Sequence, residues 1–334
     1  MGSEKTWVRW VMSLGALSVT AALSAAQTTP PARLLVLLRD ASALAIVDPV
    51  SRKELGRVPT VKDPHEVTVS ADGTTAFVAS PSEGIAVIDL AAQKELRRVN
   101  PGERSAPHDV LFADGKLYFT AEGFKTIGRY DPSTNRVEWM LGIGQDGTHM
   151  LVLSKDRSTM FVPNRGSNSV SMIEAISAGP PKWRITAIPV PGKTPEGIDL
   201  SPDGRELWTA TRGDGGVSII DVASKKVVQS FNLGMTDANR LKLTPDGRLA
   251  LILDGGTGSL VVLDAPSRKE IKRIKLAPGD TGDGGMMVMR DSSRVYLGLR
   301  DAHKVSVVDL KTLEVTNEIA MGPGSGPGCI AWVP

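Results

Sequence analysis

The fold is decided by the stretch Pro195-Glu196-Gly197-Ile198-Asp199-Leu200-Ser201-Pro202-Asp203-Gly204, followed after a short apolar run by Gly216-Val217-Ser218-Ile219-Ile220-Asp221. It reads as an alternating strand, an Asp-Gly turn, a second strand, a polar loop and a third strand that ends in an aspartate. The same order of features recurs along the chain. We therefore interpret this stretch as one unit of a repeat, with strands over about 197–201, 205–211, 217–221 and 226–233.

Two sets of acidic residues give the length of the repeat. The turn aspartate recurs at intervals of 42, 42, 47, 43 and 45 residues, at Asp72, Asp114, Asp156, Asp203, Asp246 and Asp291. The acidic end of the third strand recurs at intervals of 41, 42, 43, 47, 43 and 45 residues, at Asp48, Asp89, Asp131, Glu174, Asp221, Asp264 and Asp309. Repeats of this period with four short strands each are typical of β-propellers.

The two ends of the chain predict how the ring closes. Residues 328–333 resemble a first strand with nothing after it, whereas residues 34–38, 44–48 and 53–58 resemble the second, third and fourth strands of a unit. Pairing them removes a free sheet edge. The sequence therefore predicts an all-β fold, a seven-bladed propeller of four-stranded antiparallel blades with one blade split 1+3 between the termini.

The N-terminal residues 1–26 have the features of a cleaved signal peptide. Lys5 and Arg9 precede an apolar stretch, and Ser24-Ala25-Ala26 supplies small residues before the expected cleavage site. An uncleaved anchor is the alternative. We expect residues 27–32 to be a disordered lead-in, residues 33–334 to form a single propeller domain, and the mature protein to be periplasmic or secreted, without a membrane span.

Composition limits the partners. The formal net charge is +2 over 334 residues, which disfavours nucleic-acid binding because that needs concentrated positive charge. The lone Cys329 excludes an internal disulfide, and we expect a monomer whose core needs none. The chain has no C-x-x-C-H, Walker, G-x-S-x-G or H-E-x-x-H motif.

The repeat also carries a family resemblance. The stretch from Pro195 to Asp221 resembles the YVTN-type seven-bladed propeller repeat of exported bacterial and archaeal proteins, and Phe161-Val162-Pro163-Asn164 with Asn168-Ser169-Val170-Ser171 looks like the part that names that family. The resemblance implies the fold and export. It does not imply one activity, since the superfamily includes surface proteins, lactonases, a streptogramin-inactivating lyase and propeller subunits of redox enzymes.

Equivalent positions in successive units give the first candidate site. The residues that open the first strands are His65, His108, His149, Glu196, Asn239, Gly284 and Gly328. In a propeller these positions surround one mouth of the central channel. Three imidazoles and the Glu196 carboxylate would suit a divalent transition metal, the one cofactor we consider. The alternative is that the repeat places these histidines for structural reasons only.

A second register lies on the loops at the same end. Nine residues before the acidic end of the third strand stand Arg39, Ser80, Glu122, Arg165, Arg212, Gly255 and Arg300. Four arginines here predict a site for an anionic ligand or the acidic patch of a protein partner, together with Glu196 and Asn239. The alternative is that each arginine pairs with a nearby acid such as Asp40, Asp214 or Asp301.

The glycine-rich loops 280–285 and 322–328 supply little side-chain bulk, so they predict either a cleft on one side of the mouth or plain turns. Two functions stay open. We favour a non-enzymatic binding module, because no catalytic motif is present. The alternative is a metal-assisted lactonase or lyase that uses His65, His108 and His149.

Overall fold

The computed structural model describes residues 1–2, 32–176, 182–279 and 281–333. The chain divides into the units Met1–Pro31 and Ala32–Pro334. The signal peptide and the lead-in predicted for residues 1–32 lie outside the described residues except at Met1, Gly2 and Ala32, so they stay predictions. Among the described residues, no helix has the length and apolarity that crossing a bilayer requires.

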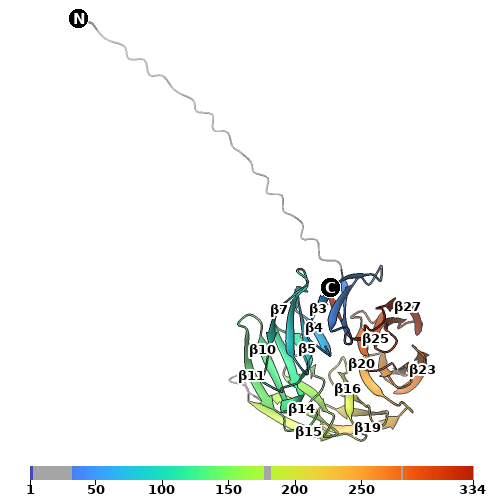
Figure 1. The fold of residues 1–334 in the computed structure, drawn as a ribbon. Coiled ribbons are helices and arrows are strands. Elements are labelled where there is room, and N and C mark those ends of the chain that lie inside the picture. Colours follow the sequence, from blue (N-terminus) through green and yellow to red (C-terminus); the bar gives the residue numbers. More distant parts are fainter. Residues whose placement is uncertain (3–31, 177–181, 280, 334) are drawn as a thin grey trace. The chain divides into compact units, whose positions relative to one another are not determined.

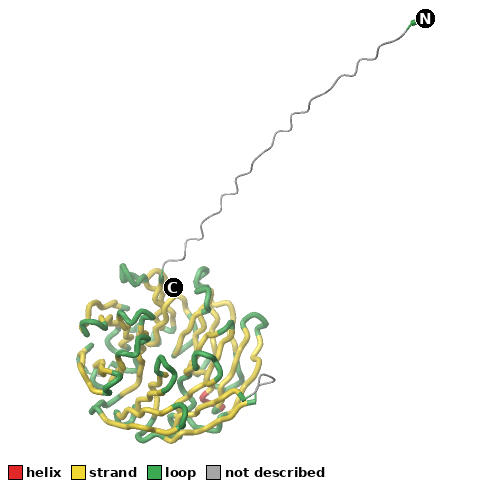
Figure 2. The backbone as a smooth tube through the Cα atoms, turned by 180° about the vertical axis from the view of Figure 1, so that it is seen from behind, coloured by secondary structure: helices red, strands yellow, loops and turns green. Residues whose placement is uncertain are grey.

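Ala32–Pro334 folds into seven four-stranded antiparallel sheets, which we call blades 1 to 7. Figure 1 shows them around a common centre, with β16 and β20 near the middle and β11, β15, β19, β23 and β27 at the periphery. Apart from one 3-10 helix, η1 (Glu122–Phe124), the regular structure that is described is β-strand (Figure 2).

Each blade runs from an innermost strand at the channel to an outermost strand at the periphery. In that order, blade 1 contains β28 (Pro327–Val333), β1 (Arg33–Leu38), β2 (Ala43–Val47) and β3 (Glu54–Pro59). Blade 2 contains β4 (Glu66–Val69), β5 (Thr75–Ser80), β6 (Gly84–Asp89) and β7 (Lys94–Val99). Blade 3 contains β8 (Pro107–Ala113), β9 (Lys116–Ala121), β10 (Thr126–Asp131) and β11 (Arg136–Gly142).

Blade 4 contains β12 (Val152–Leu153), β13 (Thr159–Asn164), β14 (Ser169–Ala175) and β15 (Trp183–Pro189). Blade 5 contains β16 (Pro195–Leu200), β17 (Glu206–Thr211), β18 (Gly216–Asp221) and β19 (Lys226–Asn232). Blade 6 contains β20 (Ala238–Leu243), β21 (Leu249–Asp254), β22 (Ser259–Asp264) and β23 (Lys269–Lys275). Blade 7 contains β24 (Gly285–Val288), β25 (Arg294–Leu299), β26 (Lys304–Asp309) and β27 (Glu314–Ala320).

The predicted closure is confirmed in blade 1. β28 pairs antiparallel with β1 from Arg33 opposite Val333 to Leu38 opposite Pro327. The last strand of the chain therefore completes the sheet that the first three strands begin, and no blade is left with three strands.

The core consists of seven apolar clusters, each between two neighbouring blades. The second strand of five blades sends an aromatic side chain into such a cluster: Phe77, Tyr118, Phe161, Trp208 and Tyr296. This register was missed in the sequence, where it lies four or five residues after the turn aspartate. Because burying one aromatic side chain removes about 150–250 Å² of surface from water, this position contributes much of the contact between blades.

Candidate functional site

The structure brings together the four predicted metal ligands at one end of the central channel. The ring centroids of His65 and His108 lie 4.8 Å apart, and those of His108 and His149 lie 3.7 Å apart. His149 Nε2 lies 3.6 Å from Glu196 Oε1. Four consecutive blades therefore supply one continuous row of side chains, which we call the mouth row.

His65 uses both ring nitrogens within the protein. Its Nδ1 lies 2.8 Å from the carbonyl oxygen of Asp63, and its Nε2 lies 2.9 Å from Nη2 of Arg39. An arginine can only donate and a carbonyl can only accept, so His65 is a neutral imidazole that donates from Nδ1 and accepts at Nε2. Burial and the Arg39 charge both lower the pKa of His65. Its Nε2 lone pair is therefore not free to bind a metal.

His108 and His149 differ from His65 because each has an unpartnered nitrogen. The two residues are only 4% and 1% exposed, and neither Nδ1 has a hydrogen-bond partner in the described part of the chain. Asn239, 1% exposed in β20, has an unpartnered Oδ1 and a long 3.4 Å bond from Nδ2 to the Gly282 carbonyl. Buried polar atoms are nearly always hydrogen-bonded, so the exceptions at His108, His149 and Asn239, gathered at one channel mouth, point to an additional binding partner.

The described residues do not form a metal site of the predicted kind. No group of three or more His, Cys, Asp or Glu side chains within the described ranges could hold a metal ion. Burial, followed by the nearby His149 and His65, lowers the pKa of His108 well below its ordinary value. The mouth row therefore offers neutral imidazole at His65 and His108 rather than imidazolium.

Glu196 is the ionised member of the mouth row. It is 3% exposed, and burial alone would raise its pKa. The neighbouring His149, together with Arg165 and Arg240, outweighs burial and lowers the pKa of Glu196 to about 2. Glu196 Oε2 lies 3.4 Å from Nε of Arg165, and Oε1 lies 3.4 Å from Nη1 of Arg212. The carboxylate is thus held by several long contacts.

Replacing Glu196 by Gln is expected to make stability less dependent on pH in acid. Because folding lowers the pKa of Glu196 from 4.5 to about 2, its ionisation stabilises the fold above about pH 4.5, and this contribution is lost as the pH falls toward about 2. Urea denaturation gives the free energy of unfolding at about pH 6 and at about pH 3. Between these two pH values, the free energy of Glu196→Gln should fall by about 2 kcal/mol less than that of the wild type. The surface variant Glu270→Gln is the control. Equal falls in Glu196→Gln and wild type would contradict the assignment.

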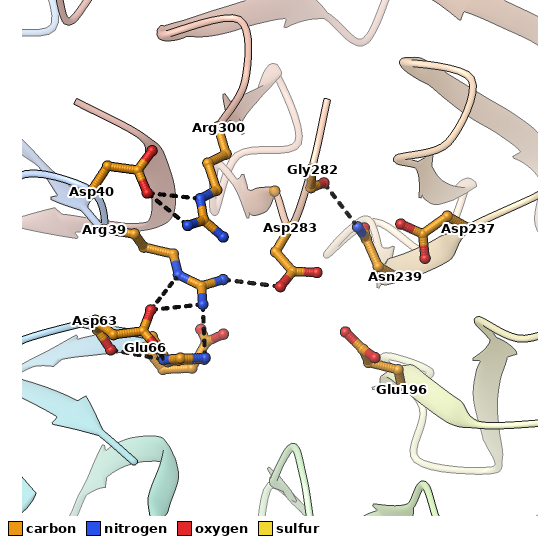
Figure 3. Close-up of polar contacts among 12 residues, drawn as sticks. Arg39, Asp40, Asp63, Glu66, Glu196, Asp237, Asn239, Gly282, Asp283 and Arg300 are labelled. Carbon is orange, nitrogen blue, oxygen red and sulfur yellow. Dashed lines mark hydrogen bonds and ion pairs between the residues drawn. The ribbon is translucent and has the colours of Figure 1, made fainter. Parts of the chain in front are cut away.

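The predicted arginine register is mostly neutralised by acids of neighbouring blades. Arg39 contacts Asp63 at 2.8 Å and Asp283 at 3.1 Å, and Arg300 contacts Asp40 at 2.6 Å. Figure 3 shows these pairs, with the guanidinium of Arg39 turned toward Asp283. Of the three acids that the sequence suggested as arginine partners, Asp40 does form an ion pair. It pairs with Arg300 of the adjacent blade and not with the neighbouring Arg39. The pairing alternative therefore describes Arg39 and Arg300.

Arg212 joins three blades. Its guanidinium lies 2.5 Å from Asp237, 2.6 Å from Asp283 and 3.4 Å from Glu196. Figure 3 shows the three carboxylates facing a common space. Burial raises the pKa of Asp237, and Arg212 opposes that rise.

Arg165 is the exception in the register, because its one ion pair among the described residues is the 3.4 Å contact with Glu196, and its side chain is 32% exposed.

One buried ion pair of the site was missed in the sequence. Arg240 of β20 donates from Nη2 to Glu66 of β4 at 2.7 Å, across the channel from blade 6 to blade 2, and from Nε to the Gly284 carbonyl at 2.9 Å. Glu66 directly follows His65 and Arg240 directly follows Asn239, which are two of the residues that open the first strands of the blades. A comparison of that next position in the seven blades could have found one arginine facing two acids. Its residues are Glu66, Asp109, Met150, Gly197, Arg240, Gly285 and Cys329.

The glycine-rich segments pack tightly where they meet. A Cβ on Gly285 or on Gly298 would lie 2.1 or 2.2 Å from the carbonyl oxygen of Gly328. Backbone therefore contacts backbone between blades 7 and 1, which is the close approach that glycine permits. These contacts leave no room for a cleft between Gly285, Gly298 and Gly328, and the absence of side chains there lets Arg240 reach the Gly284 carbonyl.

Several solved structures share this fold. Hydrazine synthase from Kuenenia stuttgartiensis matches with a TM-score of 0.69 and 17% identity over 88% of this chain and 99% of that chain. A candidate 6-phosphogluconolactonase from Bacteroides fragilis NCTC 9343 matches with a TM-score of 0.72 and 12% identity over 92% and 100%. The dihydro-heme d1 dehydrogenase NirN, in complex with DHE, matches with a TM-score of 0.65 and 14% identity over 94% and 77%. At these identities the likeness concerns the fold alone.

No curated protein matches the sequence significantly. A family model described as YNCE-like β-propeller matches residues 80–248, which is half of the chain. This match supports the β-propeller part of the family resemblance, whereas the narrower YVTN-type label is not confirmed. The chain belongs to the YNCE-like β-propeller family.

Proposed function

We propose that the chain is an exported, non-enzymatic binding module that holds a small anionic ligand at the channel mouth. The observation that carries the proposal is the set of three unpartnered atoms, His108 Nδ1, His149 Nδ1 and Asn239 Oδ1, in side chains that are at most 4% exposed. Leaving such atoms unpaired costs about 1–3 kcal/mol each, so a ligand that bonds to them would recover that free energy.

Arg165 is the side chain that would select an anion. Arg39, Arg212 and Arg300 each have a carboxylate within 2.8 Å, whereas the one carboxylate that pairs with Arg165 among the described residues is Glu196, at 3.4 Å. Its guanidinium is therefore the least neutralised of the register, and a planar guanidinium binds a carboxylate through two parallel hydrogen bonds.

The charge balance limits the ligand to a small anion. Arg212 and Arg39 share Asp283, and Arg212 also contacts Asp237, so these carboxylates would repel a second negative group near the centre of the mouth. We therefore expect a ligand with one carboxylate on Arg165 and an uncharged polar part that reaches His149 and His108. Periplasmic or secreted localisation belongs to this proposal, because it depends on the predicted signal peptide.

Arg165→Ala is expected to weaken binding of the ligand's carboxylate at least about tenfold, since a charge-assisted hydrogen bond contributes about 1.5–3 kcal/mol. The test is isothermal titration calorimetry of the mature protein with acetate, lactate and malonate. The matched control is Arg205→Ala, because Arg205 has an 84% exposed side chain and follows the turn between β16 and β17, away from the mouth row. Failure of all three acids to bind, or equal binding by the two variants, would refute the proposal.

The metal-assisted lactonase or lyase is the weaker alternative. It would need a metal on the histidines, and His65 already accepts a hydrogen bond from Arg39 at the nitrogen that would have to bind it. The ring centroids of His65, His108 and His149 lie 4.8 and 3.7 Å apart along the row, and no group of three or more His, Cys, Asp or Glu side chains among the described residues could hold a metal ion.

A further inference from the structure

A second candidate site lies between blades 7 and 1, at the end of the channel opposite the mouth. Two cavities of about 490 and 390 Å³ share Met289, Asp291 and Trp332. They are lined by the turn between β24 and β25 and by the turn between β2 and β3. In antiparallel blades these turns lie at the end away from the mouth loops. We call the two cavities together the seam groove.

The chain contains an internal reference for this groove. The equivalent cavity between blades 5 and 6 has a volume of about 470 Å³. There Arg268 bonds to Gln229 of β19 and to Glu206 of β17, so its charge is paired inside the cavity. In the seam groove Arg52 stands in the position of Arg268, four residues after the acidic end of a third strand, and bonds to Asn317 in the position of Gln229.

The two cavities differ in charge at one equivalent position. Glu206 and Arg294 both come three residues after a turn aspartate, so Arg294 stands where the other cavity has its carboxylate. Arg52 thus faces a second arginine instead of a counter-ion. Among the described residues, neither of these guanidiniums forms an ion pair, although Arg294 acts electrostatically on Asp291 and on Asp309.

A third exposed arginine, Arg290, lies at the far end of the groove. Asp291 is the one carboxylate among the lining residues of the two cavities, against three arginines. The lining of the groove therefore carries an excess of positive charge, which Asp291 and Asp309 offset only in part. This contrasts with the mouth, where most arginines are closely paired.

The floor of the groove is apolar and aromatic. The ring centroid of Tyr296, a residue only 2% exposed, lies 6.3 Å from that of Trp332, and the accessible surface comes from the half-buried Trp332, Met287 and Met289. Val50 on the rim is 87% exposed, which leaves an apolar side chain in water. Tryptophan, tyrosine and arginine are the residues that dominate binding energy at protein interfaces, and methionine adapts to the shape of its partner.

We propose that the seam groove binds an acidic segment of a partner protein, with an apolar or aromatic side chain of that segment on Trp332 and carboxylates on Arg52 and Arg294. Charge complementarity selects acidic residues. The two cavities adjoin at Met289, Asp291 and Trp332 and together offer more space than one side chain fills, which suits a peptide segment with several side chains. This site is independent of the mouth.

The test uses fluorescence anisotropy of a dye-labelled Glu-Glu-Phe-Glu-Glu peptide with the mature protein at low salt. Arg294→Glu should weaken binding of the peptide at least about tenfold. It removes one of the two arginines that would contact the peptide's carboxylates, and the new carboxylate would pair with the other, Arg52. The variant copies the charge arrangement that Glu206 already provides between blades 5 and 6, so we expect it to fold, which circular dichroism and Tm would verify.

Four comparisons make the test decisive. Arg136→Glu, an equal charge change on the exposed start of β11, should leave affinity within about twofold. The Gln-Gln-Phe-Gln-Gln and Glu-Glu-Ala-Glu-Glu peptides should both bind more weakly than the parent peptide. Arg165→Ala should bind the parent peptide as wild type does. Equal binding of the acidic and neutral peptides, equal affinity in Arg294→Glu and wild type, or loss of binding in Arg165→Ala would overturn the proposal.

Discussion

Deleting residues 328–334 is expected to abolish the cooperative fold of the whole ring. The deletion removes nearly all of β28, the innermost strand of blade 1, and so the ladder from Arg33 opposite Val333 onward. Ile330 belongs to the apolar cluster between blades 7 and 1, and Val333 to the cluster between blades 1 and 2. The truncated chain would therefore lose a strand and parts of two interfaces at once, and expose the edge of β1.

The measurement is thermal unfolding by circular dichroism, in which the truncated chain should show no cooperative transition. A synthetic peptide of residues 327–334 added in trans should restore part of the transition, since the strand acts through its pairing with β1. A scrambled peptide of the same composition is the matched control. An unchanged Tm after truncation would show that β28 is not needed to close the ring.

The fold was predictable from the sequence because its signals are local and repeated. A turn aspartate and the acidic end of the third strand each recur once per unit, so every unit confirms the others. The unit that begins at Pro195 was predicted to have strands over about 197–201, 205–211, 217–221 and 226–233, and these agree with the four strands of blade 5 to within two residues at each end. Closure was predictable for the same reason, since strands missing at one terminus are present at the other.

The site was predictable in position and less so in its contacts. The register brings His65, His108, His149 and Glu196 together because equivalent residues of adjacent blades must be neighbours. It does not say which nitrogen accepts or donates. That depends on Arg39, whose long side chain reaches from blade 1 to His65. The partners of Arg212 likewise come from three blades, and no spacing in the sequence encodes their reach.

Replacing Glu66 by Gln is expected to lower the free energy of unfolding by about 3–5 kcal/mol, a large part of the about 5–15 kcal/mol that stabilises a typical protein. The side chains of Glu66 and Arg240 are only 6% and 12% exposed and join blade 2 to blade 6 across the channel. Burial lowers the pKa of Arg240, and Glu66 and Glu196 raise it. Because arginine is effectively always protonated in proteins, the guanidinium stays charged when Glu66 is replaced. The variant therefore leaves a buried cation without its counter-ion.

Two further variants separate this cause from a general loss of charge. Glu54→Gln breaks the Arg57 pair, whose side chains are 41% and 32% exposed, and should cost less than about 1 kcal/mol. The double variant Glu66→Leu with Arg240→Met removes both charges and should recover most of the loss, because apolar side chains of similar volume replace a buried ion pair at little cost. Chemical denaturation of the three proteins measures all of these differences. If the double variant were as unstable as Glu66→Gln, the unpaired buried cation would not be the cause of the loss. The ion pair would then stabilise the ring through its own contacts.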